Sequence, residues 1–265
     1  MADSVSIIIA VVSLVGSLVA AGFTGWISYY LDQAKQRKAT KALIHKYRDP
    51  LTLAAYDLQS RIWGLVNTLL DYYEDEEKQE NIYVYTAFLI GQYLSWTYIL
   101  RRQAQFMQFS TEKTNQQLNK ILDAITEQFS WDRHAGEDPF MLWRGQQMAI
   151  GEVMTMQEEK EQLYCMGFAA FAKKYHTDAD FKKWFLPIER GVNMLVDARR
   201  RQDPIATFRL RRLQHLLIDL VLLLEFHRAT NGSNTQLKVD AAAYECKCEN
   251  CPGVLVSHPT EKLPV

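Results

Sequence analysis

The sequence lacks the motifs that usually mark an enzyme. It has no phosphate-binding glycine loop, no GxGxxG after a strand, no HExxH and no GxSxG. None of its six histidines follows a glutamate by three positions, which excludes the Glu-x-x-His pairs of di-iron bundles. These absences leave no reaction class indicated, and they favour a protein that is not an enzyme.

Proline, glycine and cysteine are also scarce. Seven prolines and twelve glycines among 265 residues argue against disorder over most of the chain. Four cysteines, three of them between Cys246 and Cys251, do not form the framework of a disulfide-stabilised protein and agree with a reducing cytosol. A net charge of −1 gives no overall attraction to nucleic acid, so we expect no nucleic-acid partner.

Charge is missing altogether from Val5–Leu31, a run of 27 residues. At about 1.5 Å per residue, such a helix exceeds the roughly 30 Å hydrocarbon core of a bilayer. Aromatic residues suited to the membrane interface lie near its end: Trp26, Tyr29 and Tyr30. A signal peptide would need basic residues before a shorter apolar core, and a wholly buried soluble helix is a second alternative. The pattern predicts a short N-terminus and a transmembrane anchor within residues 1–31.

Basic residues follow the anchor. Six of them are opposed only by Asp32 and Asp49: Lys35, Arg37, Lys38, Lys41, Lys46 and Arg48. Because positive residues concentrate on the cytoplasmic side of membrane helices, we expect a single-pass membrane protein with its N-terminus outside and the bulk of the chain in the cytoplasm. Residues 32–48 are predicted to form a basic juxtamembrane helix. The sequence does not indicate which membrane is involved.

Small residues recur at every fourth position of the anchor and therefore share one face of a helix: Ser13, Ser17, Ala21 and Gly25. Such a face lets two helix backbones approach closely in lipid, which would give a homo-oligomer formed through the anchor. Small residues are also common in membrane helices that do not associate, so both interpretations stay open.

The rest of the chain has the periodicity of helices. The first helical segment carries an apolar stripe at three- and four-residue steps: Leu51, Leu58, Ile62, Leu65 and Leu69. No segment combines period-two alternation with β-branched residues and hairpin turns. We therefore predict an all-α protein, in which the N-terminal transmembrane helix is followed by a cytoplasmic antiparallel helical bundle over residues 49–230. An irregular tail containing cysteines is expected over residues 231–265.

Further helices are expected within the bundle at about residues 111–129, 139–175 and 204–228. Within residues 139–175, three glycines indicate either tight packing or a break: Gly145, Gly151 and Gly167. Residues 81–100 are also uncharged and could in principle cross a membrane. Their tyrosines, threonines, serine and glutamine make them more polar than the anchor, and a second crossing would place Arg101 and Arg102 outside. We therefore predict that residues 81–100 form a buried bundle helix.

The segment Lys46-Tyr47-Arg48-Asp49-Pro50-Leu51, continued by Ala54-Ala55-Tyr56-Asp57-Leu58-Gln59-Ser60-Arg61, resembles a group of uncharacterised single-pass, membrane-anchored all-helical proteins. Gly91-Gln92-Tyr93-Leu94 and Ala149-Ile150-Gly151-Glu152 are similar to further blocks of that group. The resemblance implies the same anchored helical architecture over most of the chain. It implies no activity, because none is attached to the group.

Arginines crowd the region around Asp203-Pro204: Arg199, Arg200, Arg201, Arg209, Arg211 and Arg212. Guanidinium groups bind phosphates, and each basic residue near an anionic membrane surface gains about 1 kcal/mol. The cluster therefore predicts contact with anionic lipid headgroups or with a phosphorylated partner. Pairing with the acidic connector over residues 74–80, or simple solvation, is the alternative.

Three cysteines and one histidine in the tail could bind zinc: Cys246, Cys248, Cys251 and His258. Thiolates and an imidazole suit the tetrahedral zinc ion, and a metal would order an irregular segment. The C-x-C-x2-C-x6-H spacing is not a standard one, however, so free or palmitoylated thiols are the alternative, with no cofactor.

Two functions from different classes fit these observations. The first is a membrane-tethered helical scaffold or adaptor for an unknown protein partner, which the lack of a convergent catalytic set favours. The second is an enzyme or ligand-binding bundle whose site is assembled from dispersed residues such as Trp131, His134, Glu152 and His215. His215 and Asp219 lie one helical turn apart and could form an acid–base pair, although this spacing is more typical of a local hydrogen bond.

Overall fold

The computed structural model describes residues 2–73, 75–103, 113–132, 139–158, 162–203, 205–224, 237–240 and 251. Within these ranges, only the backbone is described at residues 2–13, 15, 18–19, 36–37, 39–41, 43–45, 113–115 and 205. The chain divides into two compact units, Met1–His45 and Lys46–Val265. Each unit is considered by itself below.

The first unit is helical and belongs to helix α1, which spans Ala2–Asn67. Its large apolar side chains that are described are all exposed: Leu14, Phe23, Trp26, Ile27, Tyr29, Tyr30 and Leu31. The rings of Phe23, Trp26 and Tyr30 contact one another edge to face, with centroids 6.1 and 5.3 Å apart. Among the described residues, no helix is both long enough and apolar enough to cross a membrane. The predicted anchor, Val5–Leu31, lies partly outside the described side chains.

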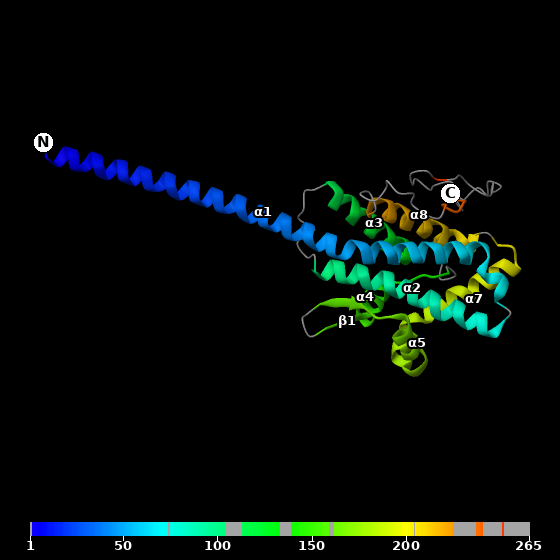
Figure 1. Cartoon of the computed structure of the whole chain (residues 1–265). Coiled ribbons are helices and arrows are strands. Elements are labelled where there is room, and N and C mark those ends of the chain that lie inside the picture. The colour runs from blue at the N-terminus through cyan, green and yellow to red at the C-terminus, as the bar shows by residue number, and fades with distance from the viewer. Residues whose placement is uncertain are drawn as a thin grey trace. The chain divides into compact units, whose positions relative to one another are not determined.

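The second unit is an α-helical bundle with one small hairpin (Figure 1). After α1 it contains η1 (Leu69–Tyr72), α2 (Glu76–Gln103), α3 (Lys113–Ser130), α4 (Arg144–Val153), β1 (Thr155–Gln157) and β2 (Leu163–Cys165). It continues with α5 (Phe168–Thr177), α6 (Ala179–Lys182), η3 (Lys183–Phe185), α7 (Leu186–Arg200), η4 (Ile205–Thr207) and α8 (Phe208–Leu224). The predicted all-α fold is thus confirmed.

One predicted helical stretch is interrupted. The segment expected to be helical over residues 139–175 forms α4 and α5, separated by the antiparallel hairpin β1–β2, in which Met156 pairs with Tyr164. Helix α4 ends at Val153, and the amide of Met166 then donates to the carbonyl of Met154. That hydrogen bond continues the ladder between β1 and β2 and brings the chain back to the end of α4. The backbone amides and carbonyls of this stretch are thus paired in the hairpin instead of in a continuous helix.

The core forms where the apolar stripes meet. Leu51, Leu58, Ile62 and Leu65 of α1 are buried, as their spacing predicts, whereas Leu69 lies in η1 and is only half-buried. Helix α2 is buried on most sides between Ile82 and Leu100, which confirms the predicted buried bundle helix. The pairs α2 with α4 and α3 with α8 pack along each other (Figure 1).

Aromatic side chains fill the contact between α2 and the segment α5–η3. Phe171 lies at the centre, with its ring centroid 5.1 to 5.6 Å from those of Phe88, Phe181 and Phe185. Rings at these separations and angles gain more than their buried area alone provides. The cluster fixes the short helices against α2 and so holds the second half of the bundle in place.

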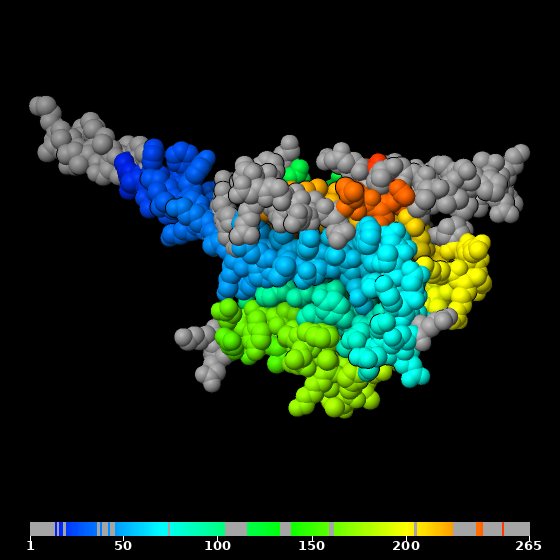
Figure 2. All heavy atoms as spheres, turned by 45° about the vertical axis from the view of Figure 1, so that its right-hand side comes forward, coloured from blue at the N-terminus to red at the C-terminus, as the bar shows by residue number. Residues whose placement is uncertain are grey.

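The end of the described chain also belongs to this unit. Residues 237–240 (orange) form part of one face of the molecule (Figure 2). Their backbone and side chains contact α8 through several hydrogen bonds.

Candidate functional site

The first three predicted arginines lie at the end of α7. Arg199 forms an ion pair with Asp71 of η1, while Arg200 lies 3.8 Å from Asp197 of its own helix. All three side chains, Arg201 included, are exposed. Internal pairing therefore applies to Arg199, through a carboxylate that precedes the predicted acidic connector. Contact of Arg199, Arg200 and Arg201 with lipid headgroups stays a prediction.

The other three arginines lie in α8 and are buried or half-buried. Arg209 is 1% exposed, and its guanidinium donates to the carbonyls of Gln128 and Trp131 at the end of α3. A side chain buried this completely cannot contact a lipid headgroup, so its inclusion in the predicted lipid contact is wrong. Arg211 donates to the carbonyl of Asp240, and Arg212 lies over the Trp131 ring with its Cζ atom 5.7 Å from the centroid.

The predicted zinc ligands are mostly beyond the described residues. Cys246, Cys248 and His258 lie outside them, whereas Cys251 is described and half-buried. The described part of the chain contains no group of three or more His, Cys, Asp or Glu residues that could hold a metal. Cys251 nevertheless contacts the imidazole of His215.

The residues proposed for a dispersed site do not gather. His134 lies outside the described residues, Glu152 is exposed on α4, and Trp131 contacts the arginines of α8. His215 does not pair with Asp219, because Asp219 binds Lys238 at 2.6 Å and the imidazole Nε2 faces the carbonyl of Val239. Burial is the main reason that the pKa of His215 is lowered, so the ring is neutral at pH 7.

The small residues of the anchor lie on an uncovered helix surface as far as they are described. Ser17 donates to the carbonyl of Leu14, Ala21 is exposed, and a Cβ atom added to Gly25 would meet nothing within 4 Å. The side chain of Ser13 lies outside the described residues. The homo-oligomer stays a prediction.

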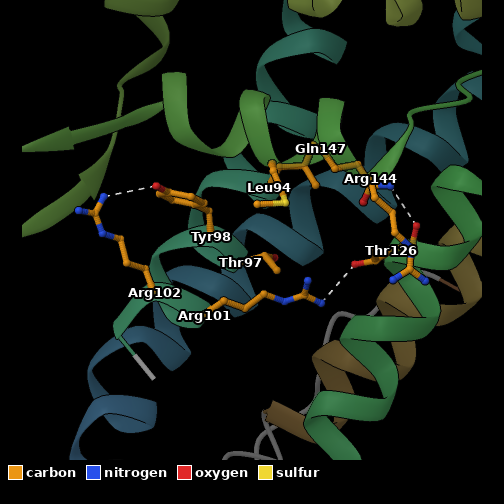
Figure 3. Close-up of a pocket in the computed structure, with 9 residues that line it drawn as sticks. Leu94, Thr97, Tyr98, Arg101, Arg102, Thr126, Arg144 and Gln147 are labelled. Atoms are coloured by element: carbon orange, nitrogen blue, oxygen red, sulfur yellow. Dashed lines mark hydrogen bonds between the residues drawn. The ribbon is translucent and has the colours of Figure 1, made fainter. Parts of the chain in front are cut away.

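The structure contains a further site that the sequence did not single out. A pocket of about 500 Å³ opens between α2, α3 and α4 (Figure 3). We call it the arginine pocket, and its lining residues are Leu94, Thr97, Tyr98, Arg101, Arg102, Thr126, Arg144, Gln147 and Met148.

Helical spacing places these residues together. The five from α2 begin at Leu94 and recur at three- and four-residue steps up to Arg102, so they share one face of that helix. The three from α4, Arg144, Gln147 and Met148, follow the same rule. The pocket therefore lies where this face of α2 and this face of α4 pack against each other.

Gly151 brings them together. A Cβ atom at this position would lie 2.8 Å from the carbonyl oxygen of Leu94 and 2.8 Å from the Cβ atom of Tyr98. Only glycine lets the backbone of α4 approach α2 this closely, one turn beyond the pocket residues. Gln147 adds a polar link to α3, because its Nε2 donates to the carbonyls of Thr126 and Leu142 at 3.0 and 2.9 Å.

Positive charge dominates the arginine pocket. Arg101 forms an ion pair with Asp123 at 2.9 Å and also donates to the Thr126 hydroxyl at 3.3 Å. Arg102 donates to the hydroxyl of Tyr98 at 3.3 Å, which carries no charge. Among the described residues, no ion pair or hydrogen bond is formed by the side chain of Arg144. In Figure 3 the guanidinium groups of Arg101 and Arg144 lie on the side of Thr126, whereas the Arg102 side chain points the opposite way, toward the Tyr98 hydroxyl. Within the part of the chain that the structure describes, Arg144 has no acidic partner.

The helix termini distinguish the three arginines. Arg101 and Arg102 lie in the last turn of α2, where cations are favoured by the negative end of the helix dipole. Arg144 is the first residue of α4, at the positive end, and no acidic residue lies in that first turn. The exposed amides of a helix N-terminus and an adjacent guanidinium both attract anions. Arg144 is therefore poorly placed for helix stability and well placed to bind an anion.

Two hydroxyl groups of the pocket lining already donate hydrogen bonds to carbonyls of their own helices. The Thr97 hydroxyl donates to the carbonyl of Tyr93, and the Thr126 hydroxyl donates to that of Leu122. Leu94 and Met148 contribute apolar surface. The nine described lining residues include no carboxylate, histidine or cysteine, and three of them carry a hydroxyl group: Thr97, Tyr98 and Thr126.

Comparison of the chain with family models, with curated proteins and with solved structures finds no significant match. The resemblance to membrane-anchored helical proteins therefore stays a prediction. The arrangement of the described residues alone has to support the function.

Proposed function

We propose that this chain is a membrane-tethered helical protein that binds an anionic ligand in the arginine pocket. The observation that carries the proposal is the presence of three arginines, Arg101, Arg102 and Arg144, in the lining of one pocket of about 500 Å³. Arg101 and Arg144 lie on the same side of it (Figure 3), and Asp123 is the one acidic partner among the described residues. A cavity of this volume suits a small molecule or a side group of a larger one. This function combines the two functions considered from the sequence, the membrane-tethered adaptor and the ligand-binding bundle, because it requires binding and no catalysis.

The ligand has an oxyanion, and a phosphate monoester matches best. Guanidinium groups bind phosphate and carboxylate through paired, charge-assisted hydrogen bonds. Arg144, with Arg101 on the same side of the pocket (Figure 3), complements a group that carries close to two negative charges at pH 7, as a phosphate monoester does. Leu94 and Met148 give the pocket an apolar wall for the body that carries the phosphate. A soluble phosphate ester and a phospholipid headgroup share this chemistry.

The membrane tether is supported by the first unit. The exposed apolar side chains between Leu14 and Leu31 would face water on a free helix, which is unfavourable at about 25 cal/mol per Å² of apolar surface. A bilayer removes that penalty, and the uncharged run Val5–Leu31 has the length to span one. The basic residues 35–48 then lie on the cytoplasmic side, with the bundle.

The binding test uses the full chain in neutral detergent micelles and isothermal titration calorimetry. Phenyl phosphate and dioctanoyl phosphatidic acid present the same group in a soluble and in a lipid form. We expect saturable binding, and a loss of affinity of about tenfold to a hundredfold in the Arg144→Gln variant, because a hydrogen bond to a charged group contributes about 1.5–3 kcal/mol. Arg144 is exposed, so the substitution leaves the fold intact.

Arg190→Gln is the matched control, since Arg190 is an exposed helical arginine of α7 and is not among the residues that line the pocket. Its affinity for both probes should equal that of the unaltered chain. Tighter binding of the lipid form would assign the pocket to a headgroup, and tighter binding of phenyl phosphate to a soluble ligand. Equal effects of the two substitutions, or no binding of either probe, would refute the proposed pocket function.

The tether is tested separately by alkaline carbonate extraction of cell membranes. The full chain should stay in the membrane pellet, and a variant with Leu14, Phe23 and Ile27 each replaced by Lys should be released. Release of the unaltered chain would remove the tether and leave the binding proposal standing.

A further inference from the structure

The arginine pocket has two ends, and its three arginines divide between them. The guanidinium groups of Arg101 and Arg144 lie at the end where Thr126 is found (Figure 3). At the other end, the Arg102 side chain points toward the Tyr98 hydroxyl (Figure 3). Successive residues of a helix are about 100° apart around its axis, so Arg101 and Arg102 leave α2 in different directions. A phosphate held by Arg101 and Arg144 is therefore not the group that Arg102 faces.

Arg102 and Tyr98 form a second set of hydrogen-bond donors. They lie one turn apart on α2, and the guanidinium of Arg102 donates to the hydroxyl of Tyr98 at 3.3 Å. A hydroxyl that accepts a hydrogen bond still has its own proton to donate. Among the described residues, Arg102 forms no ion pair and the Tyr98 hydroxyl forms no other hydrogen bond. A guanidinium beside a hydroxyl donor suits an anionic oxygen.

The lining between the two ends is uncharged. Leu94 and Thr97 lie there (Figure 3), and the Thr97 hydroxyl already donates to the carbonyl of Tyr93. Met148 adds a further apolar side chain to the lining. The pocket thus has cationic donors at both ends and a largely apolar surface between them, which matches a molecule with an anionic group at each end.

We propose that the ligand of the arginine pocket is a phosphorylated carboxylic acid, whose phosphate binds Arg101 and Arg144 and whose carboxylate binds Arg102 and Tyr98. This inference rests on the proposed binding of a phosphate monoester in the same pocket. A carboxylate is ionised at pH 7, and a guanidinium binds it through parallel N–H groups. One guanidinium with one hydroxyl matches the single charge of a carboxylate better than the larger charge of a second phosphate.

Isothermal titration calorimetry of the full chain in neutral detergent tests the second anion site. The probes are phenyl phosphates with a para carboxylate attached directly, through one methylene or through two, so that the spacing of the anionic groups varies. Each has a matched probe in which a carboxamide replaces the carboxylate. We expect at least one carboxylate probe to bind about tenfold more tightly than its carboxamide, because hydrogen bonds between ionised groups are the stronger ones.

Three variants locate the source of this preference. Arg102→Gln should make the two members of that pair bind equally, and the substitution leaves the fold intact because Arg102 is exposed. Arg144→Gln should weaken both members alike and keep their ratio, since it acts on the phosphate end. Arg190→Gln, on the exposed surface of α7, is the matched control and should keep both affinities.

The outcomes separate this inference from the pocket function on which it rests. Phosphate binding without a preference for any carboxylate probe would overturn the second anion site and leave the pocket function standing. A preference that persists in Arg102→Gln would have the same consequence. Absence of binding by all six probes would overturn both.

Discussion

Replacing Arg209 tests whether a buried arginine of α8 stabilises the C-terminal end of α3. Its buried guanidinium donates to the carbonyls of Gln128 and Trp131, which lie at the C-terminal end of α3. The last four carbonyls of a helix have no partner within that helix, and the end of α3 carries the negative end of its dipole. Arg209 thus acts as the C-terminal cap of α3, supplied by α8.

The substitution Arg209→Met keeps most of the side chain's volume and removes these interactions. Each charge-assisted hydrogen bond contributes about 1.5–3 kcal/mol. Part of this sum is offset, because burying a guanidinium is itself costly and methionine avoids that cost. We therefore expect the free energy of unfolding to fall by about 3 kcal/mol, with Arg209→Lys intermediate because it keeps the charge but loses the planar fork.

Urea unfolding of the full chain in detergent, followed by circular dichroism, measures this change. With a slope of about 2–3 kcal/mol per M, the midpoint should fall by roughly 1–1.5 M. Arg212→Met is the control, because Arg212 only covers the ring of Trp131 and should cost less than about 1 kcal/mol. Equal midpoints for both variants would refute the capping role. So would an unchanged midpoint combined with loss of binding to anionic vesicles.

Three further predictions concern other parts of the bundle. Gly151→Ala should lower the free energy of unfolding by about 1–3 kcal/mol, measured by the same urea titration, because the added Cβ would press on the backbone of α2. Burial raises the pKa of the Cys165 thiol from 9.0 to about 11, so at pH 8 its alkylation, followed by mass spectrometry, should be roughly a hundredfold slower than that of a cysteine with the ordinary value. Burial also raises the pKa of Asp57 above 3.8, so the folded state binds a proton more tightly than the unfolded state and stability falls as the pH rises through that range. Asp57→Asn should therefore raise the urea midpoint at pH 7 and have no such effect at pH 3.

Helical periodicity predicted most of the helices, and it also indicates that one of the clustered arginines, Arg209, is buried. Arg209 precedes Leu213 and Leu217 at four-residue steps, so it belongs to the buried stripe of α8, whereas Arg211 and Arg212 fall on other faces. Grouping the arginines by closeness in sequence concealed this difference. Helical spacing, applied to charged residues as well as to apolar ones, would have separated them.

Glycines such as Gly151 indicated a possible break near the end of α4, but the hairpin that follows could not be predicted from periodicity. Residues 155–165 are too short and too mixed to show a period of two, and their pairing is fixed by contacts with α2, including a hydrogen bond of 2.9 Å between the Ser95 and Thr155 hydroxyls. The hairpin therefore depends on tertiary packing rather than on local preference.

Only the α2 side of the arginine pocket could be predicted from the sequence. The face of α2 from Leu94 to Arg102 follows from helical spacing alone. The addition of Arg144 depends on the crossing of α4 over α2 at Gly151, and a single sequence does not reveal which helices meet. Its only local signal was an arginine at a helix N-terminus without acidic neighbours.

Anomalous X-ray scattering from crystals of the full chain soaked in tungstate would test the central claim most directly. Tungstate is a heavy-atom oxyanion with two negative charges, so it reports where the protein binds a phosphate-like group. We expect an anomalous peak inside the arginine pocket, within hydrogen-bonding distance of the Arg144 guanidinium group and on the side of the pocket where Arg101 also lies (Figure 3). A pocket that holds only water while tungstate binds elsewhere on the protein would contradict the account.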